Sequence, residues 1–161
     1  MIGNMYNCFD ISKEFLRLAS QEGKGVDTMK LLKLTYIAHG YYLGFFDRSL
    51  FSNKVEAWKY GPVIPELYGV IKRFRSMAVD IELVDLYSEH EVSQEDREFL
   101  ASMWQSYKHL SGRELSALTH QPGSPWDQVY IKDQYNLVIP NEIIKNYYLT
   151  KIEKWSDGLA A

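Results

Sequence analysis

The apolar segment TMKLLKLTYIAHGYYLGFF, residues 28–46, constrains the fold of this chain more than any other part of the sequence. Asp27 directly before it offers an N-cap, and its apolar residues spread over more than one stripe of a helix. A helix that is apolar on most sides is surrounded by other elements, so we predict a central core helix here. Gly40 and Gly44 each lower the intrinsic helix propensity by about 1 kcal/mol, which predicts that a neighbouring element approaches closely at both positions.

Hydrophobic periodicity and capping residues predict the other helices. The first covers residues 11–22, with Asp10 or Ser12 as its N-cap and Gly23 or Gly25 as its terminator. We also predict helices over residues 66–75, 93–107, 113–120 and 142–155, and a short one around Pro125 and Trp126. Their starting signals are Pro65, Ser93 with Asp96, Ser111 with Glu114, Ser124 with Asp127, and Asn141.

The stretch GPVIP, residues 61–65, predicts a stiff corner between a strand and a helix. The preceding residues 55–60 alternate imperfectly between apolar and polar, as in a short strand that Gly61-Pro62 ends. Gly61 and Ile64 each precede a proline, which steers both away from the α region into extended conformations. Pro65 suits the first position of the next helix, where its missing N–H costs nothing.

Two further segments, residues 79–87 and 137–139, carry the pattern of short strands. The whole pattern predicts a mainly α (α+β) fold: a compact single domain over residues 1–161, with about six helices and a small two- or three-stranded sheet. We expect residues 156–161 to form a frayed C-terminal tail.

The charge balance and the single cysteine limit the classes of function. A net charge of −3 and a pI near 5.8 give no broad positive field for a phosphate backbone, so nucleic-acid binding is disfavoured. Cys8 cannot form an internal disulfide, and the N-terminus lacks the pattern of a secretory signal. The longest apolar run, residues 31–46, is interrupted and falls short of the roughly 20 residues of a membrane span. We therefore expect a cytoplasmic protein that does not enter a membrane.

The ionisable residues form no recognised catalytic or metal-binding motif. None of the four histidines stands in a metal-ligand spacing, and phosphate-binding glycine motifs are absent, so we expect neither a metal nor a cofactor. Glu56 and Glu66 flank the corner and His120 ends a helix, which leaves an acid–base enzyme open as an alternative. We favour structural roles for all three: an ion pair for Glu56, a helix-dipole position for Glu66 and carbonyl capping for His120.

The aromatic residues and one basic run leave two interpretations open. Five aromatic residues are of types most often found in the core, where truncating any buried one should cost about 3–5 kcal/mol: Trp58, Tyr60, Tyr68, Trp104 and Trp126. Tryptophan and tyrosine also anchor protein interfaces, and this chain has twelve tyrosines. The basic residues at 72, 73 and 75 favour a solvated face or, alternatively, a surface that meets an acidic partner.

Three blocks in the same order, MKLLKLTYIAHGYYL, EAWKYGPVIPELY and LSALTHQPGSPW, closely resemble the Panacea-domain family, also called SocA-like or GepA-like. The resemblance covers residues 10–148. We expect its hallmark positions to define the scaffold more than the partner surface. In this sequence they are Lys30, Leu34, Tyr36, Glu56, Ala57, Trp58, Tyr60, Gly61, Pro62, Pro65, Tyr68, Leu118, Thr119, His120, Pro125 and Trp126.

The resemblance implies an antitoxin of a bacterial or phage two-gene toxin–antitoxin system, which neutralises a cognate toxin by direct protein–protein binding and has no enzymatic activity. The implied partner is a toxin protein, expected from an adjacent gene. The alternative is a proteolytic adaptor that delivers the toxin to a cytoplasmic AAA+ protease. For the partner surface we predict the region of the corner and the helix after it, with Tyr68, Lys72 and Arg75 as contacts.

The last residues carry a separate hypothesis. Leu159-Ala160-Ala161 resembles the Leu-Ala-Ala ending that bacterial unfoldases recognise in tagged proteins. A labile antitoxin would suit such a degradation signal, and a frayed terminus is the alternative interpretation.

Overall fold

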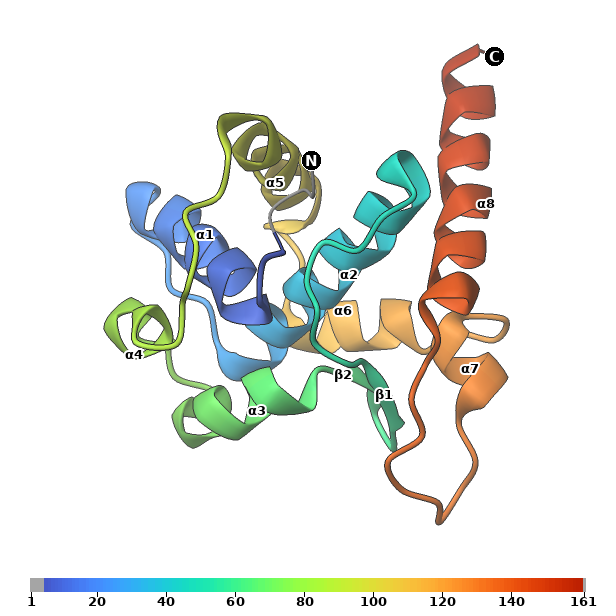
Figure 1. Cartoon of the computed structure of the whole chain (residues 1–161), viewed down its shortest axis with the longest axis horizontal. Coiled ribbons are helices and arrows are strands. Elements are labelled where there is room, and N and C mark those ends of the chain that lie inside the picture. The colour runs from blue at the N-terminus through green and yellow to red at the C-terminus, as the bar shows by residue number, and fades with distance from the viewer. Residues whose placement is uncertain (1–4, 161) are drawn as a thin grey trace.

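The computed structural model describes the backbone of residues 5–160 and the side chains of residues 5–154. In this part of the chain the fold is mainly helical, as predicted, with eight α-helices and one two-stranded antiparallel sheet (Figure 1). The helices are α1 (Cys8–Gln21), α2 (Thr28–Phe46), α3 (Pro65–Ile71), α4 (Ile81–Asp85), α5 (Gln94–Tyr107), α6 (Gly112–Thr119), α7 (Pro125–Val129) and α8 (Asn141–Ala160). The strands are β1 (Glu56–Trp58) and β2 (Gly61–Val63).

Helix α2 lies at the centre of the fold, as its apolar character predicted. Every residue from Leu31 to Gly40 is buried, and α2 packs against α1, α5, α6 and α8. Figure 1 shows α1 and α5 on one side of α2 and α8 on the other. Although α2 is apolar, it is not long and apolar enough to cross a membrane, and neither is any other helix of the described residues.

The two glycines of α2 allow α8 to pack closely against it, which confirms the predicted close approach. A Cβ atom on Gly40 would overlap the ring of Tyr148, and one on Gly44 would lie 2.7 Å from Cδ1 of Ile152. Tyr148 is 5% exposed, so its ring is enclosed by the core and cannot move aside without disturbing its neighbours. The packing of α8 therefore depends on the absence of side chains at these two positions.

Helix α1 begins earlier than predicted. Its N-cap is Asn7, whose side chain accepts hydrogen bonds from the N–H groups of Phe9 and Asp10, so the predicted caps Asp10 and Ser12 are wrong. Asp10 occupies the third helical position and completes a capping box by accepting from the N–H of Asn7 at 2.9 Å. Ser12 is buried inside the helix, where its hydroxyl donates to the carbonyl of Cys8.

The segment predicted as a strand over residues 79–87 contains helix α4 instead. The side chain of Asp80 caps α4 by accepting from the N–H of Glu82, which favours a helical turn at this point. Val79 and Val84 are the buried apolar residues, and the Val79 N–H donates to the carbonyl of Val26. The alternation in the sequence was misleading because the chain buries residues five apart, not every second one.

The predicted corner is a β-hairpin followed by a helix. β1 and β2 pair in antiparallel register, with Glu56 opposite Val63 and Trp58 opposite Gly61. Gly61-Pro62 therefore begins a second strand, where we predicted only the end of the first. The segment 137–139 lies along the other edge of β1 and forms a single bridge there, between Val138 and Glu56, not a full strand.

Helix α3 starts at Pro65 as predicted but ends sooner. After Ile71 the chain continues as a 3-10 turn over residues 72–74, and Arg75 follows with a left-handed φ of 52°. Lys72 and Arg75 are exposed, but they lie beyond the α-helix on which the periodicity placed them.

Candidate partner-binding surface

The corner of the hairpin and α3 is held by its tryptophan. The indole Nε1 of Trp58 donates to Oε1 of Glu56 at 2.9 Å, so Glu56 has an indole partner and not the predicted ion pair. The ring of Trp58 meets the ring of Tyr68 edge-on, with 5.4 Å between their centroids. Tyr68 is half-buried, with Trp58 covering part of its ring.

A second tryptophan ties the distant segment around α7 to this corner. The indole Nε1 of Trp126 donates to the backbone carbonyl of Trp58. The ring of Trp126 packs edge-on against His120 and stacks on Tyr130, with centroid distances of 5.3 and 4.7 Å. His120 ends α6, and its Nδ1 donates to the carbonyl of Ser116, which confirms the predicted capping role.

A buried lysine of α2 forms a hydrogen bond with the backbone of the corner. Lys33 of α2 is 1% exposed, and its ammonium group donates to the carbonyl of Pro62 at 2.7 Å. Burial lowers the pKa of Lys33 to about 7. Gly61 lies over this group with φ of 121°, and a Cβ atom there would lie 3.0 Å from Nζ of Lys33. Only glycine suits this position, because it combines a positive φ with a close approach.

The buried Lys33 makes folding stability depend on pH. Between its folded pKa near 7 and its unfolded value of 10.5, the unfolded chain binds the proton more tightly, so raising the pH favours the folded state. From pH 7 to pH 9 we expect the free energy of unfolding to rise by about 2 kcal/mol relative to a Lys33→Met variant. Urea denaturation of both proteins at several pH values measures this difference. Parallel pH profiles for the two proteins would contradict it.

The hallmark positions of the sequence lie mainly in the scaffold. The buried ones include Leu34, Tyr36, Ala57, Gly61, Pro62 and Pro125. Tyr60 is 65% exposed at the turn between β1 and β2, so its expected place in the core is wrong. Lys30 is half-buried, with its ammonium group donating to the carbonyl of Lys108. These contacts fix the arrangement of α2, α6, α7 and the hairpin.

The three residues considered for catalysis do not form a common site in the described contacts. Glu56 accepts from Trp58, and His120 donates to Ser116. Glu66 is exposed in the first turn of α3, the position favoured by the helix dipole. No hydrogen bond or ion pair among residues 5–154 joins any two of them, and none of them lines the pocket described next.

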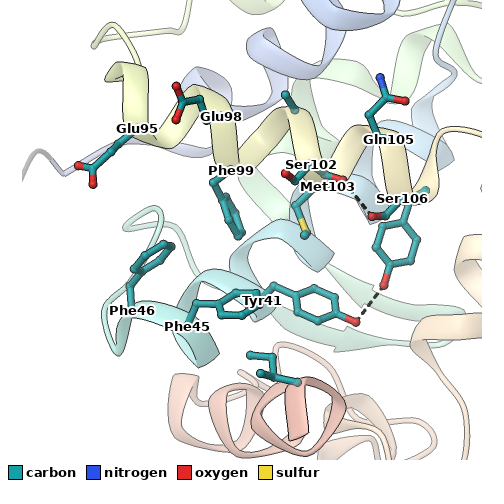
Figure 2. A pocket seen from close by; sticks show the side chains of 13 residues that line it. Tyr41, Phe45, Phe46, Glu95, Glu98, Phe99, Ser102, Met103, Gln105 and Ser106 are labelled. Atoms are coloured by element: carbon teal, nitrogen blue, oxygen red, sulfur yellow. Dashed lines mark hydrogen bonds between the residues drawn. The ribbon is translucent and has the colours of Figure 1, made fainter. Parts of the chain in front are cut away.

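An open pocket of about 1080 Å³ lies on the opposite part of α2, between α2, α5 and α8 (Figure 2). We call it the aromatic groove. Three residues of α2, nine of α5 and one of α8 line it. Figure 2 shows Phe99 and Met103 of α5 pointing toward Phe45 and Tyr41 of α2. The walls are thus side chains from three helices, and most of the surface they present is apolar.

The apolar side chains of the groove are incompletely covered. Phe45 and Phe46 are 46% and 47% exposed, and Phe99 packs edge-on against both rings at 6.4 and 5.8 Å. Adjacent aromatic rings exposed at the rim of a pocket are typical of a surface that a partner covers. The polar groups of the groove are the paired hydroxyls of Tyr41 and Tyr107, 3.0 Å apart, and residues on the exposed side of α5.

Sequence reasoning missed this groove. None of Tyr68, Lys72 and Arg75, the predicted partner contacts, lines it. One usable signal was the position of Phe45 and Phe46 at the end of the apolar segment, next to Asp47, which terminates α2 in a left-handed conformation. Another was the pair Phe99 and Met103, four residues apart on one side of α5.

Comparisons with known proteins bear directly on the family. A family model described as "Antitoxin SocA-like, Panacea domain" matches residues 31–127, more than half of the chain. The chain is 28% identical over 112 residues to the antitoxin SocA of Caulobacter vibrioides (strain NA1000 / CB15N), over 65% of this chain and 60% of that protein. No solved structure matches. The resemblance inferred from the three sequence blocks is confirmed: this chain belongs to the SocA-like antitoxin family with a Panacea domain.

Proposed function

We propose that this chain neutralises a cognate toxin, encoded by an adjacent gene, by binding it directly in the cytoplasm. Membership of an antitoxin family supports the general role. The aromatic groove is the observation that supports direct binding, because Phe45 and Phe46 are exposed there beside further apolar side chains. Covering such rings supplies much of the free energy of a protein interface.

The surroundings of the three catalytic candidates support stoichiometric action over turnover. Glu56 and His120 are engaged in contacts that hold the corner together, and Glu66 lies exposed on α3. A general acid and a general base have to reach the same reacting atoms. The proposed antitoxin therefore acts by occupying its partner.

Co-expression with the toxic neighbouring gene tests the proposal. We expect restored growth, and a stoichiometric complex of the two proteins that survives gel filtration. A Glu56→Gln, Glu66→Gln, His120→Gln variant whose circular dichroism matches that of the wild type should rescue growth equally well. Loss of rescue by this folded variant would point to an enzyme, and failure of the wild-type chain to bind or rescue would reject the proposal.

Protease-deficient cells distinguish blocking from delivery to a protease. A blocker protects these cells as well as it protects wild-type cells, because occupancy alone silences the toxin. Protection that disappears with the AAA+ protease would instead identify an adaptor.

The ending Leu159-Ala160-Ala161, proposed as a degradation signal, lies outside the residues whose side chains are described. Replacing Ala160-Ala161 with Asp-Asp and following turnover in growing cells tests it separately.

A further inference from the structure

We infer that the aromatic groove binds an amphipathic α-helix of the toxin, with its apolar face in the groove and Lys or Arg side chains along the flank that faces α5. This inference rests on the proposed function and adds which surface is used and what kind of element it receives. Three features of the groove support this inference. Its walls come from helices alone, the charged residues in its lining are acidic, and a pair of tyrosine hydroxyls lies inside it.

The walls of the groove favour a helix over an extended peptide. All of the lining residues lie on α2, α5 or α8, whose backbone groups are paired within their own helices. An extended segment gains its affinity by pairing with a free strand edge, and no strand lines this groove. A helix satisfies its own backbone hydrogen bonds and so needs no pairing partner in the groove. Its apolar side chains can then meet Phe45, Phe99 and Met103.

The acidic residues of the groove favour a bound helix with a basic flank. Glu95 and Glu98 of α5 are exposed at its rim, and the lining contains no Lys or Arg among the described residues. Neither carboxylate forms an ion pair with a cation in residues 5–154. Arg48 lies near Phe46 and donates to the hydroxyl of Tyr42; its positive charge also acts on Glu95, which leaves Glu98 as the carboxylate without a nearby cation. Lys or Arg on the α5-facing flank of the occupant would supply the complementary charge.

The hydroxyl pair supplies a polar contact inside the groove. Tyr107 donates its hydroxyl hydrogen to the oxygen of Tyr41, and the hydrogen of Tyr41 has no acceptor in the described hydrogen bonds (Figure 2). An amide oxygen or a helix-terminal carbonyl of the occupant can accept this hydrogen. The pair would therefore fix the position of the bound helix along the groove.

Charge and ring substitutions in the full-length chain test the inference on the co-purified complex. Glu95→Lys with Glu98→Lys should weaken toxin binding about tenfold at low salt and much less at about 0.5 M salt, where rim charges are screened. The matched control is Glu82→Lys, compared with Glu95→Lys alone, because Glu82 is exposed outside the groove and, like Glu95, lies in the first turn of a helix. Phe45→Ser with Phe46→Ser should weaken binding about 30-fold or more. Tyr135→Ser, at an 83% exposed ring outside the groove, should leave it unchanged.

Photo-crosslinking identifies what occupies the groove. A benzoylphenylalanine residue in place of Phe46 should crosslink to one toxin segment that is helical and carries Lys or Arg on one flank, whereas the same group in place of Tyr135 should not. If the wild-type chain fails to bind the toxin, the proposed function itself is rejected. If it binds and rescues, but groove variants behave like their controls or the crosslink reaches an extended segment or a second copy of this chain, the helix inference is wrong while the proposed function stands.

Discussion

Replacing Gly40 with leucine is expected to lower the free energy of unfolding by about 4 kcal/mol. A Cβ atom at this position already overlaps the ring of Tyr148, and leucine adds three further carbons to the same space. Either α8 moves away from α2 or the ring of Tyr148 leaves the core, and both expose a large apolar area to water. Urea denaturation followed by circular dichroism measures the loss.

Gly69 offers the matched control for this substitution. It lies in α3, and nothing lies within 4 Å of a Cβ atom built there. Gly69→Leu should therefore be neutral or should stabilise the chain by up to about 1 kcal/mol, because leucine has the higher helix propensity. Equal destabilisation by the two leucines would show that the contact between Gly40 and Tyr148 does not determine the packing of α8.

Replacing Asp10 with alanine is expected to lower the free energy of unfolding by about 3 kcal/mol. Its carboxylate is buried and accepts hydrogen bonds from the N–H groups of Asn7, Glu89 and His90 and from the hydroxyl of Ser88, at 2.6 to 2.9 Å. Alanine would leave these donors without their acceptor and would release the 88–90 segment from α1. Chemical denaturation and amide hydrogen exchange of residues 88–90 report the two consequences.

Asp80→Ala separates this effect from the simple loss of a helix cap. Asp80 is exposed and caps α4 through one bond to the N–H of Glu82, so its removal should cost only about 1 kcal/mol. It should also leave hydrogen exchange of residues 88–90 unchanged. A cost for Asp10→Ala no larger than that for Asp80→Ala would mean that the buried carboxylate contributes little more than an ordinary cap.

The parts of the fold that depend on local contacts could be predicted from the sequence. Asp27, Ser93, Ser111 and Ser124 were predicted to start helices, and each accepts a hydrogen bond from the N–H group three residues later. Such bonds involve neighbouring residues alone, so a short stretch of sequence contains all that decides them. The same holds for Pro65 at the start of α3.

The predictions failed where a distant contact decides the structure. Asp10 has the right chemistry for an N-cap, but its carboxylate also binds residues 88–90, and Asn7 takes the cap. The strand predicted over residues 79–87 is a helix whose position is set by the burial of Val79 and Val84. A single sequence does not show which distant residues will meet.

For the candidate surface, only the apolar positions on each helix could be predicted from the sequence. Phe45, Phe46, Phe99 and Met103 were visible as apolar positions on two helices, but their exposure depends on how the ends of α2, α5 and α8 lie relative to one another. Trp58 and Trp126 were correctly expected to pack into the structure. Their direct link, from the indole of Trp126 to the carbonyl of Trp58, joins residues too far apart in the chain for periodicity to connect.

The place of α8 in the fold affects how this domain can be cut and reused. The family match ends at residue 127, yet the helix that begins at Asn141 supplies Tyr148 to the core and Ile152 to the groove. A fragment trimmed to residues 31–127 would also lack α1, and the apolar flanks of α2 would face water. Such a fragment is expected to aggregate on expression, so fusions and chimeras of this chain should keep both flanking helices.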